Sequence, residues 1–340
     1  MPLPYLLLVP LVAGVLFVNG FTDAPNAITS VVCTGALRFR SAALLAAACN
    51  MAGLFFSWRF MPLVQNTICE MLDLAGMNSI AALTAVCAAM AAVVAFAVLA
   101  WAFGIPTSES HALIAALTGA ALALGGRRAV NPLAWAKVIW GLLLSSAGGL
   151  AAGFLGGKGV NRLAKRGTGE YRPPRSLKSL QLICAALLSA LHGAQDGLKF
   201  AAVLVMADGL LMGKGLQEGV NLSQNAGPVL LCAAVMAAGT LAGGKRIIEA
   251  VGRKMVKLNT LSGTASDLAA CLLLFAATLW GLPASTTHTK TCAVLGAGLS
   301  EDREKVGFGM LFGILFAWAV TFPVCGALGY VITGALLRMM

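Results

Sequence analysis

Charged residues are scarce in this chain. Only 11% of its 340 residues are Asp, Glu, Lys or Arg, against about 25% in typical soluble domains, while 59% are hydrophobic. The mean hydropathy is +0.86. This composition excludes an ordinary soluble domain and predicts a protein that is embedded in a membrane.

Several familiar motifs are also absent. The sequence has no Gly-rich phosphate loop ending in Lys-Ser or Lys-Thr, no dinucleotide-binding fingerprint and no His-Glu-x-x-His pair, so we predict neither an enzyme nor a cofactor. Its nine cysteines include no Cys-x-x-Cys pair and are interpreted as small hydrophobic residues. No cleavable basic leader precedes the first apolar run, which we expect to be retained.

The apolar residues form long runs. Because spanning the hydrocarbon core takes roughly 20 helical residues, these runs predict an all-α polytopic protein with about eight to twelve crossings or part-crossings. The runs cover residues 3–18, 41–58, 79–103, 133–155, 180–191, 228–243, 261–280 and 306–337.

The net charge of +11 arises from basic residues between the apolar runs, mainly in segments 156–179 and 245–257. By the positive-inside rule, both segments are expected to be cytoplasmic. The position of these charges favours a multi-pass protein of a bacterial cell membrane, in contact with lipid, and disfavours a nucleic-acid surface.

Two pairs of motifs indicate an internal duplication. Residues 104–111 read Gly-Ile-Pro-Thr-Ser-Glu-Ser-His and residues 281–288 read Gly-Leu-Pro-Ala-Ser-Thr-Thr-His, an offset of 177 residues. Residues 19–23 (Asn-Gly-Phe-Thr-Asp) and 192–196 (His-Gly-Ala-Gln-Asp) match at an offset of 173 residues. Two independent pairs at nearly one offset predict two homologous halves.

We place the halves at residues 1–155 and 180–340, joined by a basic linker at 156–179 that contains four Gly and Pro residues near its centre. If an odd number of crossings precedes this linker, the halves are inverted across the membrane. Glycine pairs such as Gly148-Gly149 and Gly243-Gly244 permit close helix packing, within one chain or between the chains of a homodimer.

Four carboxylates lie inside or against apolar runs, where a charge costs about 2.5 kcal/mol or more and marks a functional site. They are Asp23, Glu109, Asp196 and Asp267. Gly20, Pro25 and Gly193 are expected to interrupt the helices beside Asp23 and Asp196, and freed carbonyls with carboxylates and amides suit a hard cation such as sodium. The alternative is a kinked helix with a buried, hydrogen-bonded Asp.

The Gly-x-Pro-x-Ser motifs cannot lie against lipid, because they combine a proline with a run of hydroxyls. We predict paired re-entrant loops whose tips expose helix N-termini, which offer N–H groups and a partial positive charge to a tetrahedral oxyanion. The alternative is that the serines serve only as helix N-caps. The histidines His111, His192 and His288 all fall in the motifs, either as proton carriers or as structural residues. Lys199 either neutralises Asp196 or extends to an interface.

The motifs at 19–26, 192–199 and 281–288, with the stretch 243–252, resemble the PiT family of inorganic phosphate transporters. The resemblance implies two inverted repeats with broken helices and paired re-entrant loops, and symport driven by sodium or protons. It implies phosphate contacts from Ser108, Ser110, Ser285, Thr286 and Thr287. It implies a cation site, which could hold sodium, at Asn19, Asp23, Asn26, Gln195 and Asp196. From their positions in the motifs and apolar runs, we select Asp267, Glu109, His111, His192 and His288 as further candidate coupling residues.

The sequence departs from the family pattern at several positions. Glu109 stands where the second half has Thr286, and is a candidate proton site or a helix cap. Asn50 and Asp267 stand where Glu is common, and Thr22 and Gln195 replace Asn.

We therefore expect phosphate import by cation symport with alternating access, and favour the proton over sodium because of Asn50 and the three histidines. Phosphate would enter alone or as a neutral divalent-metal complex. The alternatives are a permease for sulfate or another tetrahedral oxyanion, and a channel or sensor that does not concentrate its anion.

Overall fold

The computed structural model describes residues 2–74, 76–103, 107–165, 175–212 and 226–340. Within these ranges the chain is helical, and its only β-type pairings are isolated bridges. The α-helices are α1 Leu3–Thr22, α2 Pro25–Cys33, α3 Phe39–Phe60, α4 Leu63–Glu70, α5 Ser79–Ala102, α6 Glu109–Gly125, α7 Pro132–Leu143, α8 Gly149–Lys165, α9 Arg175–His192, α10 Leu198–Leu211, α11 Ala226–Ala242, α12 Lys245–Glu249, α13 Thr260–Leu279, α14 Thr286–Glu301 and α15 Phe308–Met339. The π-helices are η2 Leu144–Gly148, η3 Gly193–Gly197 and η5 Ala250–Met255, and the 3-10 helices are η1 Gly126–Ala129 and η6 Arg303–Lys305.

The described residues contain seven helices that are long and apolar enough to cross a membrane, or eight if the bent pair α11–α12 is counted as one span. The shorter helices α4, α6 and α14 are part-crossings by length. The predicted all-α polytopic fold is therefore confirmed, and these spans and part-crossings together fall within the predicted eight to twelve.

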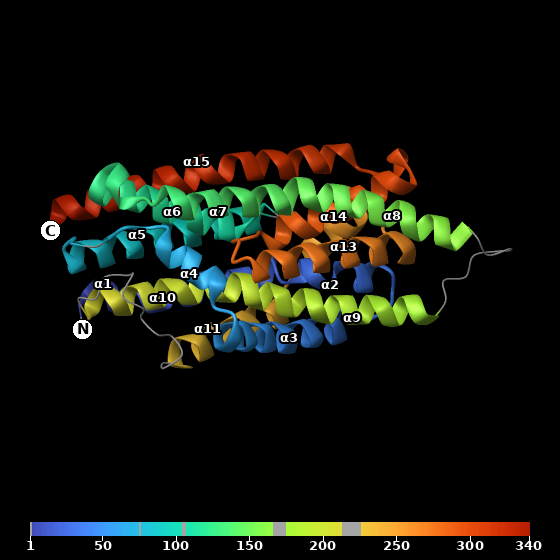
Figure 1. The fold of residues 1–340 in the computed structure, drawn as a ribbon, viewed down its shortest axis with the longest axis horizontal. Coiled ribbons are helices and arrows are strands. Elements are labelled where there is room, and N and C mark those ends of the chain that lie inside the picture. Colours follow the sequence, from blue (N-terminus) through green and yellow to red (C-terminus); the bar gives the residue numbers. More distant parts are fainter. Residues whose placement is uncertain (1, 75, 104–106, 166–174, 213–225) are drawn as a thin grey trace.

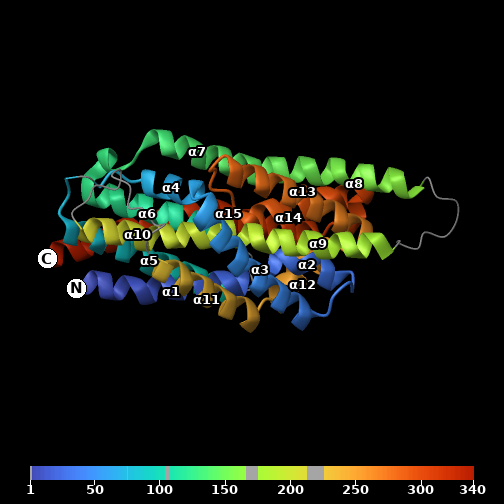
Figure 2. The ribbon, with the colours of Figure 1, turned by 60° about the horizontal axis from the view of Figure 1, so that its bottom comes forward.

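The two halves run in opposite directions. In Figure 1 the N- and C-termini lie at one end of the molecule, and α8 and α9 reach the other end. Figure 2 shows the same arrangement after a turn about the long axis. The first half therefore begins at one end and finishes at the other, and the second half begins where the first finishes. This is the inverted arrangement predicted from the duplicated motifs.

Matching backbone contacts in the two halves support the same conclusion. An isolated bridge joins Leu72 to Val130 in the first half and Val256 to Val306 in the second. In each half, the residue bridged is thus just after α4 or η5, and its partner is in the short segment that follows α6 or α14.

The predicted helix break occurs at the first Asp motif, where α1 ends at Thr22 and α2 begins at Pro25. At the second motif Gly193 does not end the helix, contrary to prediction, because α9, the π-helix η3 and α10 follow one another without a gap. Gly20 does not interrupt its helix, contrary to prediction. A Cβ at Gly20 would collide with the Met236 backbone, so this glycine allows α1 and α11 to pack closely.

The same close packing recurs where α3 crosses α9. A Cβ on Gly53 of α3 would collide with the Ala190 backbone of α9, and a Cβ on Gly193 would collide with the backbone of Asn50. Small residues where helices cross allow their backbones to approach closely. In a membrane, where there is no hydrophobic effect between helices, the resulting van der Waals contacts stabilise the packing.

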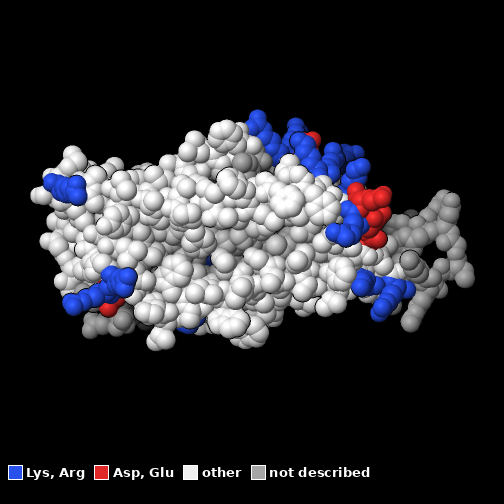
Figure 3. All heavy atoms as spheres, turned by 90° about the horizontal axis from the view of Figure 1, so that it is seen from above, with Lys and Arg blue, Asp and Glu red and all other residues white. Residues whose placement is uncertain are grey.

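Charged side chains are concentrated toward one end of the molecule. Figure 3 shows a broad face without charge, with Lys and Arg grouped mainly toward the end where α8 ends and α9 begins. Lys158 and Arg162 share a surface cleft there with Lys305, whose carbonyl accepts the backbone N–H of Lys257, so the end of the second basic segment lies beside α8. Helices α8 and α9 extend into the predicted linker from both sides, and the four Gly and Pro residues near its centre lie outside the described ranges.

Candidate functional site

The two Ser-containing motifs meet at the centre of the fold. Ser108 is the N-cap of α6 and Ser285 is the N-cap of α14, where their Oγ atoms accept hydrogen bonds from the backbone N–H groups of His111 (3.3 Å) and His288 (3.2 Å). The two Oγ atoms are 2.8 Å apart. The serines are therefore N-caps, and they also bring the N-termini of α6 and α14 together.

Asp196 accepts several side-chain hydrogen bonds in the second half of the site. Its Oδ1 accepts hydrogen bonds from Ser110 Oγ (2.8 Å) and Lys199 Nζ (2.9 Å), and its Oδ2 accepts one from Thr286 Oγ1 (3.1 Å). His192 Nε2 lies 3.4 Å from Oδ2 without hydrogen-bond alignment. One carboxylate thus joins both predicted re-entrant segments to the π-helix η3.

The first half supplies the matching Asp23 group. Asn19 Nδ2 donates to Asp23 Oδ2 at 3.3 Å and to Asp196 Oδ2 at 3.5 Å, so one amide links the two carboxylates. Asn26 Nδ2 donates to Thr287 Oγ1 at 3.2 Å. The segment around each duplicated Asp therefore contacts the predicted re-entrant segment of the opposite half. Asn26 donates a hydrogen bond to Thr287, and Asp196 accepts one from Ser110.

Glu109 lies in the first turn of α6 and is 1% exposed. Thr22 Oγ1 donates to its Oε1 at 2.7 Å, while Oε2 has no protein partner within the described residues. Ser108, not Glu109, caps α6. The helix dipole stabilises a carboxylate at this position, and its free oxygen can accept a hydrogen bond from a protonated ligand.

Lys199 is fully buried in its ion pair with Asp196 and does not extend to an interface. Its Nζ also donates to Ser110 Oγ at 2.9 Å and to the carbonyl of Ala284. Of the two roles considered for Lys199, neutralisation of Asp196 is the one that the structure shows.

Gln195 connects η3 to the loop that precedes α14. Its Nε2 donates to Thr278 Oγ1 (3.0 Å) and to the carbonyl of Leu282 (3.3 Å), and its Oε1 accepts the N–H of Ala284 (3.2 Å). The amide thus fixes the loop that presents Ser285.

The histidines occupy two places. The rings of His111 and His288 meet edge to face at 4.2 Å, and the ring of His288 stacks on Trp318 at 3.5 Å. His192 Nδ1 lies 3.2 Å from Asn50 Oδ1. Asn50 stands where a carboxylate is common in the PiT family. Its side chain contacts one ring nitrogen of His192, and the other ring nitrogen faces Asp196.

Asp267 belongs to a separate cluster. It accepts hydrogen bonds from Ser30 Oγ (2.6 Å) and from Lys290, whose Nζ also donates to Ser30 Oγ (2.7 Å) and Ser266 Oγ (3.1 Å). Asp267 stands out in the sequence as a carboxylate in an apolar run, and its partner Lys290 is the basic residue in the helix that follows His288.

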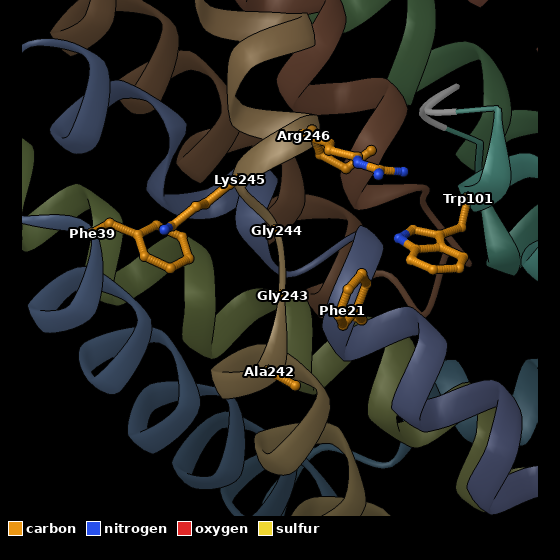
Figure 4. Close-up of a pocket in the computed structure, with 9 residues that line it drawn as sticks. Phe21, Phe39, Trp101, Ala242, Gly243, Gly244, Lys245 and Arg246 are labelled. Carbon is orange, nitrogen blue, oxygen red and sulfur yellow. The ribbon is translucent and has the colours of Figure 1, made fainter.

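A polar and aromatic cavity of about 360 Å³ lies beside the break between α11 and α12. Figure 4 shows Lys245 beside Phe39 on one side and Arg246 beside Trp101 on the other, with Phe21 between them. Gly244, with φ of +106°, makes the bend that places these two basic residues there.

Comparison with known proteins identifies the family of this chain. A model described as the phosphate transporter family matches residues 19–170 and 160–329. A probable low-affinity inorganic phosphate transporter of Bacillus subtilis is 32% identical over 92% of this chain and 91% of its own length. One of Rhizobium meliloti is 34% identical over 94% of each chain. A solved structure titled the sodium-dependent phosphate transporter has the same fold, with a TM-score of 0.89, 18% identity and full coverage of both chains.

Proposed function

The chain belongs to the phosphate transporter family, and we propose that it imports inorganic phosphate by proton symport, with alternating access between its inverted halves. It is a multi-pass cell-membrane transporter and not an enzyme. The observation that carries the proposal is the meeting of two buried helix N-termini through Ser108 and Ser285. Two partial positive charges and several hydroxyl donors converge there, as a tetrahedral oxyanion requires.

Five hydroxyl residues are proposed to bind phosphate, each from a buried position on one of the two re-entrant segments. They are Ser108, Ser110, Ser285, Thr286 and Thr287. Ser110 and Thr286 donate to Asp196, so a bound phosphate would compete with this carboxylate for their hydrogens. A divalent metal bound to the phosphate would reduce the negative charge of the ligand and therefore its repulsion by the Asp196 carboxylate.

Alternating access is proposed to use the symmetry of the halves. Residues 1–155 and 180–340 are the repeats, and the basic segment 156–179 joins them, on the cytoplasmic side by the positive-inside rule. Because each half contacts the loop of the other through Asp196 and Asn26, a relative movement of the halves would change the central site from both sides at once.

The coupling ion is proposed to act on Asp23 and Glu109, with the three histidines as further coupling residues. Of the four buried carboxylates, Asp196 and Asp267 are paired with lysines, whereas Asp23 and Glu109 have amide and hydroxyl partners. A sodium site at Asn19, Asp23, Asn26, Gln195 and Asp196 is the alternative. The sodium dependence stated for the solved relative makes sodium a serious competitor of the proton.

Gradient-driven uptake tests this proposal. In proteoliposomes, labelled phosphate is expected to accumulate under an imposed inward proton gradient and to collapse with an uncoupler, while an imposed sodium gradient alone gives no accumulation. Accumulation under the sodium gradient only would contradict proton coupling. Equilibration without accumulation under either gradient would favour the channel or sensor.

Glu109 is expected to favour phosphate over sulfate. Near neutral pH phosphate retains a proton that can be donated to the free Oε2 of Glu109, whereas sulfate has none. Glu109→Gln should therefore increase about tenfold the inhibition by sulfate of labelled-phosphate binding to the purified protein, because a hydrogen bond to a charged group contributes about 1.5–3 kcal/mol.

The matched control is Glu70→Gln, which removes an exposed carboxylate paired with Lys137. Its sulfate inhibition should equal that of the wild type. If Glu109→Gln also discriminates like the wild type, Glu109 has no part in selectivity.

A further inference from the structure

Two lysine ammonium groups are enclosed by oxygen atoms in the interior of the protein. Lys290 Nζ contacts Ser30 Oγ (2.7 Å) of α2, and Ser266 Oγ (3.1 Å) and the Asp267 carboxylate of α13. The side chain of Lys290 is 2% exposed. These partners use all three hydrogens of the ammonium group.

Lys199 has an equivalent environment. Its Nζ lies 2.9 Å from Asp196 Oδ1 and 2.9 Å from Ser110 Oγ, and it donates to the carbonyl of Ala284. One carboxylate, hydroxyl oxygens and a backbone carbonyl are the ligands that hard metal cations take in proteins. Both lysines therefore occupy positions whose other atoms would suit a small cation.

The duplication shows that the fold itself does not need these charges. By motif register, Asn26 is the equivalent of Lys199, since each lies three residues after the Asp of its half. Asn26 contacts the hydroxyl of Thr287 as Lys199 contacts that of Ser110, but without a charge.

At the offset of 177 residues that separates Ser108 from Ser285, the equivalents of Asp267 and Lys290 are Met90 and Leu113. Both are fully buried apolar residues. The Asp267–Lys290 pair is therefore found in the second half only. In the first half, two apolar residues occupy the corresponding positions.

We propose that Lys290 and Lys199 are tethered cations that fill two oxygen-lined sites for a monovalent metal cation such as sodium. This proposal rests on the proposed symport. If the lysines fill these sites, no cation from solution binds at Asp267 or Asp196, and coupling involves Asp23 and Glu109. Removal of either lysine should expose a sodium site, because the oxygen atoms and the carboxylate remain in place.

Thermal unfolding of the purified protein tests this assignment. Lys290→Ala should unfold at a lower temperature than the wild type in choline chloride, because Asp267 loses its partner. At about 200 mM, sodium chloride should raise the Tm of the variant by about 5 °C over choline chloride, as expected for a ligand that binds only the folded state. The wild type should show no comparable rise.

The double variant Asp267→Asn with Lys290→Ala is the matched control. It lacks the carboxylate that would hold the ion, so its Tm should be the same in both salts. A Lys290→Ala protein that responds to sodium no more than the wild type, or a double variant that responds equally, would overturn the proposal for this site.

Lys199→Asn provides a second test that the fold should accommodate, since Asn26 occupies the equivalent position. It should bind more radioactive sodium than the wild type in a binding assay without phosphate, and an unchanged amount would overturn the proposal for Lys199. Because this assay contains no phosphate, its outcome is independent of transport. Failure of the wild type to accumulate phosphate would overturn the proposed function and leave the binding result standing.

Discussion

Phosphate uptake should fall about 100-fold or more when Ser108 and Ser285 are both replaced by alanine. Their Oγ atoms are 2.8 Å apart where the N-termini of α6 and α14 meet. Two hydrogen bonds to a charged ligand contribute about 1.5–3 kcal/mol each, which is more than tenfold per hydroxyl. The measurement is the initial rate of labelled phosphate uptake into proteoliposomes at equal protein density.

The loss of two helix caps is a competing cause, because each cap contributes about 0.5–2 kcal/mol to stability. Asn78→Ala removes a comparable cap from α5, where the Asn78 side chain accepts the N–H groups of Ile80 and Ala81 at 2.9 and 3.2 Å. This control should retain wild-type uptake per folded molecule. If the double serine variant is folded and transports normally, the two serines do not bind the substrate.

The largest loss of stability is expected from a side chain at Gly193. A Cβ there would collide with the backbone of Asn50, and the partner backbone cannot move away as a flexible side chain could. Gly193→Val should therefore lower the free energy of unfolding by about 3 kcal/mol or more, at or above the usual cost of overpacking, because the obstacle is main chain. Unfolding can be followed by heating in detergent, with uptake measured in parallel.

Gly313→Val in α15 is the matched control, because no atom lies within 4 Å of the position of its Cβ. It should unfold within a few degrees of the wild type. Equal stability of the two variants would mean that α3 and the α9–η3 helix do not pack as closely as the structure has them.

The sequence by itself determined the repeats and the location of the site. Polar residues and helix breakers are conspicuous against a composition that is 59% hydrophobic, so the paired motifs stand out without any structure. The membrane also restricts the chain to helices, which made the fold class predictable from the length of the apolar runs. All of the residues selected for the site are buried in the structure.

Only the tertiary structure decided which of these residues contact one another. Ser110 and Asp196 are 86 residues apart, and Asn26 and Thr287 are 261 residues apart, so their pairing depends on how the two halves pack. Asp267 was grouped with the central site, yet it pairs with Lys290 in a separate cluster. A pattern along the chain reveals that a buried charge needs a partner, but the choice among several partners follows from helix packing, which brings distant residues together in three dimensions.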